Sequence, residues 1–202
     1  MPRFESKIDP KSDAYRANRE AHLALIAEFR GLEDKIRAHS ARSEPKFRKR
    51  GQLLPRERLD LLLDRGAPFI GISTLCGYKM HDDDGDANIS GGGNIAGIGF
   101  VSGVRCMIAA SDYGIRGGAA TPLGGDKGLR AQQIAMENKL PYVQLIESAG
   151  ANLFRQSEMF VKGGRGFANL AKMSAMGIPV IGVTHGSSTA GGAYQSGLCD
   201  YL

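Results

Sequence analysis

The sequence predicts an α/β protein in which helices connect the strands of a parallel layer. Short apolar runs alternate with longer amphipathic stretches over residues 95–202, which is typical of strand–helix–strand units. Two proline-led apolar runs, 140–146 and 178–183, each lead directly into a loop of small residues. Because such strands are joined by right-handed crossovers, both loops are expected at one edge of the sheet.

Composition limits the possible functions. The 202 residues are 42% hydrophobic and 23% charged, enough for one good-sized domain or a domain with an extension. The net charge is +5, but the basic residues are not interleaved with aromatic ones and there is no tryptophan, which argues against nucleic-acid binding. No apolar run approaches the length of a membrane span. Three widely spaced cysteines and no evident targeting segment predict a cytoplasmic protein with reduced thiols.

The N-terminal third is predicted to be helical. Residues 12–40 form an amphipathic helix with an apolar stripe, consistent with packing on the main body or on a neighbouring subunit. Residues 41–52 are a basic linker, and 54–66 a second helix, with Pro55 in its first turn and Gly66 as its C-terminal cap. We therefore expect a helical extension and linker over 1–50 and the main domain over 51–202.

The middle of the chain predicts a strand at 69–73 and a hairpin made by strands 95–100 and 105–110. The acidic loop 81–86 has its glycine at the wrong position for a calcium loop and is interpreted as a solvated turn, so no metal site is predicted. Residues 91–96 match the letters of a dinucleotide fingerprint. However, they enter a strand where that motif must open a helix.

The remaining elements alternate. A glycine-rich stretch, 111–120, precedes a helix at about 126–139, and another helix spans 157–176, interrupted by glycines. Gly117 and Gly118, with Lys127 and Arg130 after them at the predicted start of the first of these helices, are candidates for binding phosphates. A solvated helix face is the alternative interpretation of the two basic residues.

The two small-residue loops, 147–151 and 186–194, carry the chemistry that the residues themselves suggest. Neighbouring strands that end in turns with almost no side chain present their backbone N–H groups to one point. That arrangement is an oxyanion hole. The predicted donors are the N–H groups of Ala149, Gly150, Gly191 and Gly192; ordinary turn glycines are the alternative.

Other candidate side chains have simpler interpretations. Ser187 and Ser188 lack the Gly-x-Ser-x-Gly elbow of serine hydrolases. His185 has no acidic partner at a suitable spacing and is interpreted as a hydrogen-bonded histidine at a strand end. Glu147 is interpreted as a carboxylate that caps a loop and not as a general base.

Several ordered motifs resemble a known family. They are Arg56 to Asp64, Gly117-Gly118, Lys127 to Gln132, Glu147-Ser148-Ala149-Gly150-Ala151, and Ser188-Thr189-Ala190-Gly191-Gly192-Ala193-Tyr194. Over roughly 47–202 the chain resembles the carboxyltransferase (β) subunit of biotin-dependent acyl-CoA carboxylases, in particular the methylcrotonyl-, geranyl- and propionyl-CoA group. The resemblance implies a ClpP/crotonase-like ββα superhelix, preceded here by the helical extension.

The resemblance also implies an activity. The family removes a proton next to the thioester carbonyl of an acyl-CoA and transfers a carboxyl group there from carboxybiotin, which a partner carrier holds. No side-chain base is needed, because the released donor can take the proton. The implied partners are a biotin carboxylase, a biotin carrier subunit and further copies of the chain, in a homo-oligomer.

Two departures from the family pattern are visible. Family members carry two such domains in tandem, whereas this chain stops at Leu202, within an expected strand, which suggests a fragment or a half-enzyme. Ala149 stands where many members have glycine, yet it still donates its N–H. The alternatives left open are a crotonase-like CoA hydratase, isomerase or hydrolase, and a non-catalytic CoA-binding assembly subunit.

Overall fold

A five-stranded mixed sheet forms the centre of the molecule in the computed structural model, which describes residues 5–202. The first four residues, part of the predicted extension, lie outside the described residues. The strand order is β1-β2-β3-β4-β5; β1, β2 and β3 pair antiparallel, and β3, β4 and β5 pair parallel. The strands are β1 (Ile70–Gly71), β2 (Asn94–Val101), β3 (Val104–Ser111), β4 (Tyr142–Ser148) and β5 (Val180–Ser188). The predicted α/β class and parallel layer are confirmed.

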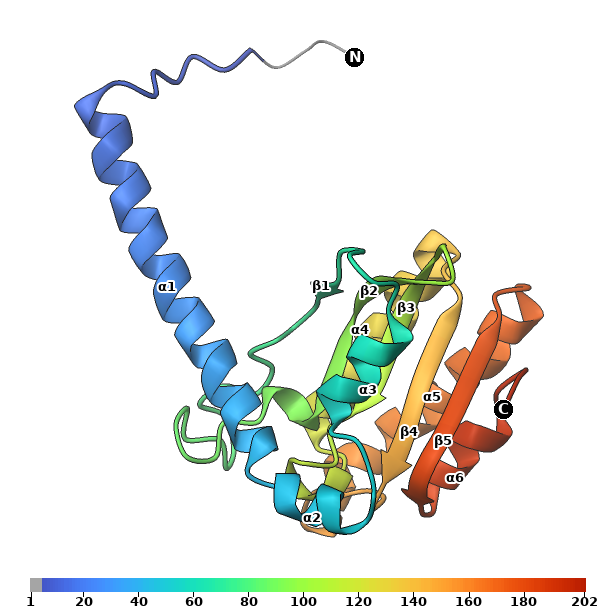
Figure 1. Cartoon of the computed structure of the whole chain (residues 1–202). Coiled ribbons are helices and arrows are strands. Elements are labelled where there is room, and N and C mark those ends of the chain that lie inside the picture. Colours follow the sequence, from blue (N-terminus) through green and yellow to red (C-terminus); the bar gives the residue numbers. More distant parts are fainter. Residues whose placement is uncertain (1–4) are drawn as a thin grey trace.

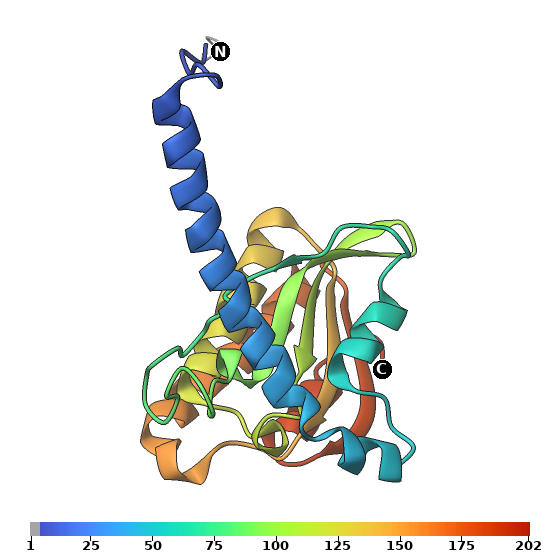
Figure 2. The same cartoon turned by 60° about the vertical axis from the view of Figure 1, so that its left-hand side comes forward.

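The first helix, α1 (Asp13–Ala41), matches the predicted one and projects away from the sheet (Figures 1 and 2). Ser12 caps it by accepting a hydrogen bond from the N–H of Tyr15, 3.2 Å away. Only the C-terminal part of the predicted apolar stripe is covered: Ile36 is 5% exposed, whereas Phe29 is 43% exposed. The helix therefore docks by its last turns.

The predicted basic linker contains a short helix that the sequence pattern did not predict, α2 (Glu44–Lys49). Phe47 in this helix is buried, and the Arg58 guanidinium lies 5.6 Å from the centroid of its ring. A single buried aromatic side chain anchors the segment, because it packs where the surrounding charges stay in water. The basic composition of the segment did not predict this buried phenylalanine.

Helix α3 (Pro55–Leu62) begins with Pro55 as predicted but ends four residues before the expected glycine cap. Leu63 is already extended, with φ −74° and ψ 144°. The carboxylate of Asp64 accepts hydrogen bonds from the N–H groups of Ser102 and Gly103, each at 2.7 Å. Asp64 thus binds the tip of the β2–β3 hairpin, and Gly66 serves a later turn instead of the helix end.

The predicted hairpin is confirmed, with Val101 paired to Val104 and positive φ angles at the two residues between them. The glycine triplet before it forms a single 3-10 turn, η1 (Gly91–Gly93), that leads into β2. The rejected dinucleotide motif therefore does not open a helix. The expected strand at 69–73 is reduced to the two residues of β1.

Two long helices cover one face of the sheet. Helix α4 (Pro122–Asn138) starts four residues earlier than predicted, because the side chain of Thr121 caps the N–H of Gly124 at 3.1 Å and Pro122 suits the first turn. Helix α5 (Gln156–Ala175) confirms the helix predicted at 157–176, but it is continuous through its glycines, so the predicted interruption was wrong. The short helices η2 (Arg116–Gly118), η3 (Leu153–Arg155) and α6 (Gly191–Gly197) complete the order.

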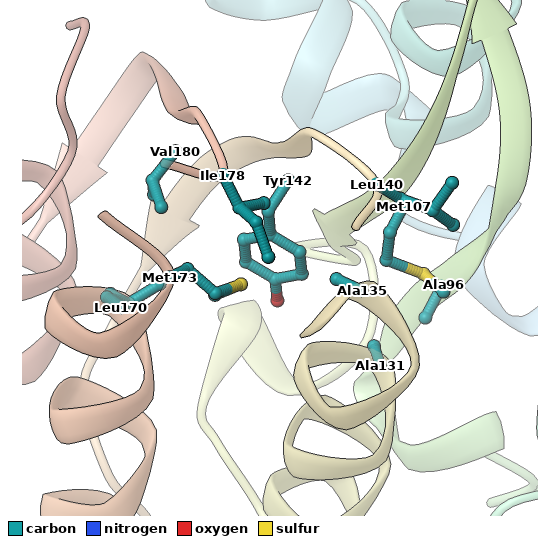
Figure 3. Close-up of a cluster of buried hydrophobic side chains, with 10 residues drawn as sticks. All are labelled: Ala96, Met107, Ala131, Ala135, Leu140, Tyr142, Leu170, Met173, Ile178 and Val180. Atoms are coloured by element: carbon teal, nitrogen blue, oxygen red, sulfur yellow. The ribbon is translucent and has the colours of Figure 1, made fainter. Parts of the chain in front are cut away.

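The core has two layers. One cluster lies between the sheet and helices α4 and α5; Figure 3 shows Tyr142 and Met107 facing Ala135 and Met173 in it. A second cluster lies on the other face, where Leu59 of α3 meets the sheet. Because side chains alternate along a strand, β4 sends Tyr142 to one layer and Val143 to the other. Because of the same alternation, successive side chains at the end of β4 point to opposite faces of the sheet.

Candidate active site

A cleft of about 700 Å³ opens between α4, α5 and the ends of β4 and β5. Both helices turn glycines toward it, beside larger side chains: Gly124, Gly125 and Gly128 from α4, and Gly163, Gly164 and Gly166 from α5. Where a helix wall carries glycine, a long, narrow ligand can approach the main chain closely.

Two turns border this cleft. We call residues 148–151, after β4, turn 1, and residues 189–192, after β5, turn 2. The N–H of Thr189 donates to the carbonyl of Ser148 at 3.1 Å, which joins the two turns directly. A side chain added at Gly192 would lie 2.8 Å from the Cβ of Ser148. The glycine is therefore required for the turns to lie this close together.

The four predicted N–H donors divide into two kinds. The N–H of Gly150 donates to Oγ of Ser148 at 3.0 Å, and the N–H of Gly192 donates to the carbonyl of Thr189 at 2.9 Å. Within residues 5–202, the N–H groups of Ala149 and Gly191 donate to no protein acceptor. The N–H groups of Ala151 and Ala190 likewise donate to no protein acceptor in that range, so each turn keeps two unpaired amides, and an unpaired amide is ready to receive an oxyanion.

The backbone of turn 2 has an uncommon conformation. Ala190 has φ 46° and ψ −116°, a combination that L-residues rarely adopt and that costs about 1–3 kcal/mol. Turn 1 makes its equivalent bend at Gly150, whose φ of +89° is natural for glycine. Backbone strain at a ligand-facing turn is typical of functional sites.

The other face of the sheet carries a buried charge cluster beneath the turns. Glu147 is 1% exposed and forms an ion pair with Arg58 of α3, Nη1 to Oε2 at 3.3 Å. Nδ1 of His185 lies 3.6 Å from the same carboxylate oxygen. Burial, aided by the positive charge of Arg58, lowers the pKa of His185 to about 4. The ring is therefore neutral at physiological pH.

This cluster changes two sequence-based interpretations. Neither ring nitrogen of His185 makes a hydrogen bond among the described residues, so the predicted hydrogen-bonded histidine was wrong. Glu147 neither caps turn 1 nor faces the cleft, because strand alternation turns it toward α3. The backbone of Gly186 packs against this carboxylate, and an added Cβ there would lie 2.5 Å from it.

The predicted phosphate-binding residues are scattered. Gly118 lines the cleft, whereas Gly117, Lys127 and Arg130 do not. Lys127 lies in the second turn of α4, not at its start as predicted, and it is 4% exposed. Its Nζ donates to the carbonyls of Gly91 and Asn94, at 3.0 and 2.7 Å.

Burial lowers the pKa of Lys127 to about 8. The buried ammonium stabilises the entry to β2, and its donors are directed at backbone carbonyls. Arg130 is exposed on α4.

Sequence reasoning missed several cleft residues. Ser148 was treated only as part of a motif, although it touches both turns. Phe167 of α5 and Tyr194 of α6 line the cleft and pack together with ring centroids 5.3 Å apart. The pattern of three glycines at spacings of three and four in one helix was the available signal for the α4 wall.

Competing chemistries find little support among residues 5–202. The hydroxyl of Ser188 is buried and has no hydrogen-bond partner, so no base activates it. One carboxylic acid, Glu158, lines the cleft. No group of three or more potential metal-ligating side chains is found in this range. None of its helices is both long and apolar enough to cross a membrane.

Comparison with known proteins identifies the family. The model of the carboxyl transferase domain matches residues 46–202. The chain is 40% identical over 201 residues to the probable methylcrotonoyl-CoA carboxylase beta chain of Drosophila melanogaster, covering 98% of this chain and 34% of the relative. It is also 40% identical over 203 residues to the probable biotin-dependent acyl-coenzyme A carboxylase beta2 subunit of Mycobacterium tuberculosis, covering 98% and 37%.

Among solved structures, the beta subunit of geranyl-CoA carboxylase from P. aeruginosa is 58% identical and superposes with a TM-score of 0.89, covering 99% of this chain and 37% of that one. The chain thus spans about a third of the length of these relatives. The crotonase-like fold that the resemblance implied is confirmed. With its family domain, its fold and its bare paired turns in agreement, the chain belongs to the carboxyl transferase domain family.

Proposed function

We propose that this chain is the acyl-CoA-binding part of a biotin-dependent acyl-CoA carboxyltransferase. The observation that carries the proposal is the pair of unpaired amides, Ala149 in turn 1 and Gly191 in turn 2, in adjoining turns that border the cleft. The family membership and the names of the relatives support the same activity.

The geometry accounts for enolate formation. A thioester oxygen placed between the N–H groups of Ala149 and Gly191 gains negative charge when the neighbouring carbon loses a proton. Fixed backbone donors hold that charge without reorganising, and each contributes about 3–4 kcal/mol to lowering the barrier. We assign Gly150 and Gly192, whose amides are occupied, the role of shaping the turns. Glycine at Gly192 keeps turn 2 against Ser148.

The carboxyl donor must reach the same point. The four residues of the predicted donor set carry at most a methyl group, so none of their side chains obstructs a second planar group above the thioester. Carboxybiotin, when bound, supplies the activated carboxyl group and an acceptor for the released proton. This fits a site whose described turns hold no side-chain base: the nearest buried carboxylate, Glu147, faces away and is paired with Arg58.

The cleft is proposed to hold the CoA portion. Gly118 lies on its wall, and Gly117 adjoins it. We propose that Arg130, exposed on α4, and Lys162, which lines the cleft, attract the CoA phosphates. Lys127 remains a predicted phosphate ligand, but its ammonium is engaged by carbonyls, so we expect it to act by holding the wall in place.

The acyl group is proposed to be a hydrocarbon chain. Relatives are named for methylcrotonoyl-CoA and geranyl-CoA, whose acyl groups are apolar. Apolar side chains of η3 and α5, Leu153, Met159 and Phe160, line the cleft here. We further propose a homo-oligomer that works with a biotin carboxylase and a biotin carrier. We expect it in the cytoplasm, as its three free cysteines suggest.

The decisive experiment measures transfer of label from radioactive bicarbonate to an acyl-CoA by a carboxyltransferase subunit that carries this chain, with the biotin carboxylase and carrier present. We expect avidin-sensitive carboxylation. Enoyl-CoA hydration without carboxylation would instead support the hydratase alternative, which the single cleft carboxylate, Glu158, disfavours. Tight acyl-CoA binding without any turnover would support a non-catalytic subunit.

A further inference from the structure

Ser148 is the residue at which the two turns are joined. Its carbonyl accepts hydrogen bonds from the N–H of Thr189 at 3.1 Å and from the Thr189 hydroxyl at 3.4 Å. Its own hydroxyl accepts the N–H of Gly150 at 3.0 Å. One residue thus binds turn 2 through its backbone and shapes turn 1 through its side chain.

The side-chain bond removes one amide of turn 1 from the possible donors. Ala149, Gly150 and Ala151 follow Ser148 in this turn, and the Ser148 hydroxyl occupies the N–H of Gly150 alone. Such a bond from a serine to the amide two residues on closes a compact local turn. Gly150 is thereby held at φ +89°, and the N–H of Ala149 is left without a protein acceptor among the described residues.

Packing reinforces the same arrangement. Gly192 of turn 2 lies directly over the side chain of Ser148, so closely that an added Cβ would be 2.8 Å from the serine Cβ and 3.2 Å from its Oγ. The hydroxyl therefore lies at the contact between the turns, where few rotamers are open to it. A side chain confined in this way keeps its hydrogen-bond partner.

We propose that Ser148 is a positioning residue for the reaction. Its hydroxyl removes the Gly150 amide from the possible donors of turn 1 and sets where the Ala149 amide lies relative to the Gly191 amide of turn 2. This inference rests on the proposed function, since it names how the oxyanion pair of that site is assembled. Ser148 acts through Gly150 and Ala149 and need not touch the thioester itself.

The chain offers a matched control at the neighbouring strand. Ser188 of β5 is the register partner of Ser148 of β4. Its hydroxyl is buried and has no hydrogen-bond partner among the described residues. Ser148→Ala and Ser188→Ala therefore delete the same atom at paired positions, and the first alone breaks a hydrogen bond to a turn.

Two measurements on the 202-residue chain test the inference. Amide hydrogen exchange of glycine-labelled protein reports on the N–H of Gly150, and calorimetric titration compares butyryl-CoA with free CoA, which lacks the carbonyl. In Ser148→Ala we expect the Gly150 amide to exchange at least tenfold faster, because its hydrogen bond is gone. We expect butyryl-CoA to bind about fivefold to tenfold more weakly and free CoA to bind unchanged. In Ser188→Ala we expect neither the exchange rate of the Gly150 amide nor the affinity for butyryl-CoA to change.

The outcomes distinguish failure of the positioning role from failure of the proposed function. Unchanged Gly150 exchange in Ser148→Ala overturns the positioning role whether or not a ligand binds. Faster exchange with equal loss of butyryl-CoA and free CoA affinity also overturns it, since the effect would then be general loosening. If the wild-type chain binds neither ligand while the exchange difference is present, the proposed function fails and the local structural role of Ser148 stands.

Discussion

Turn 1 and turn 2 each keep two unpaired amides among the described residues, yet they reach that state by different means. In turn 1 the side chain of Ser148 occupies the Gly150 amide, and the positive φ falls on a glycine. In turn 2 the Gly192 amide is satisfied by the backbone carbonyl of Thr189, and the positive φ falls on Ala190. Turn 1 thus depends on a side chain, whereas turn 2 depends on backbone geometry and carries strain.

The strands beneath the two turns differ as well. Under turn 1, β4 ends in a buried carboxylate, Glu147, that is paired with Arg58. Under turn 2, β5 carries His185, whose depressed pKa keeps it neutral. A paired charge fixes one strand end and a neutral ring fills the space beside the other. The comparison shows that similar glycine-bearing sequences are supported by unlike neighbours, and four experiments test it.

The largest effect is expected from Gly191→Pro in turn 2. This change deletes the free amide at the first position of α6, where proline's missing N–H costs the helix nothing. Carboxylation should fall by about a hundredfold to a thousandfold, as for loss of one oxyanion donor. Gly191→Ala is the matched control: it keeps the N–H, and its added Cβ meets only Phe167, at 3.4 Å. Equal activity of the two variants would remove Gly191 from the donor pair.

The next effect is on stability and concerns the strand under turn 1. Glu147→Ala leaves Arg58, whose side chain is 10% exposed, without its carboxylate. Removing one partner of a buried ion pair should lower the free energy of unfolding by about 3 kcal/mol. Urea unfolding measures this, with Glu44→Ala as the control, because that exposed carboxylate contributes about 0.5 kcal/mol or less. Similar losses in both variants would contradict a special role for Glu147.

The strand under turn 2 is tested by pH. His185 has a pKa of about 4 in the folded chain and an ordinary value near 6.5 when unfolded. Between these values the unfolded chain binds the extra proton, so stability is complete above about pH 6.5 and falls as the pH drops toward 4. The slope from this one group is at most about 1.4 kcal/mol per pH unit.

In His185→Met this contribution should disappear, because methionine does not titrate. The difference between the wild-type and variant unfolding curves, measured from pH 4 to 7, isolates the histidine from the carboxylates that titrate in the same range. Curves that stay parallel throughout would show that the histidine does not differ between the folded and unfolded states.

The smallest effects come from exchanging the positive-φ residues of the two turns. Ala190→Gly relieves the conformation at φ 46° and should raise the free energy of unfolding by about 1 kcal/mol. Gly150→Ala, at φ +89°, should lower it by about 1 kcal/mol, although the added methyl has room, with Thr189 Oγ1 3.5 Å away. Thermal melting measures the shift in Tm of each variant relative to the wild-type chain. Shifts of the same sign would show that strain is not the difference between the turns.

Local sequence patterns determined the elements and the location of the site. Proline-led apolar runs predicted β4 and β5, alternation and a two-residue turn predicted the β2–β3 hairpin, and the small residues after the parallel strands predicted paired turns at one sheet edge. These features depend on residues near one another in the chain, whose backbone preferences and side-chain periodicity act locally. The family resemblance supplied the activity to be tested.

Only the tertiary structure decided how the predicted donors are used. Which amides remain free depends on Oγ of Ser148 and on the carbonyl of Thr189, and no spacing rule reveals those contacts. Lys127 was placed at a helix start by its neighbours, but Thr121 begins the helix earlier and the lysine points at Gly91, 36 residues away. Burial, ion pairs and shared hydrogen bonds join distant segments, so their outcome is set when the layers pack and not by the local sequence.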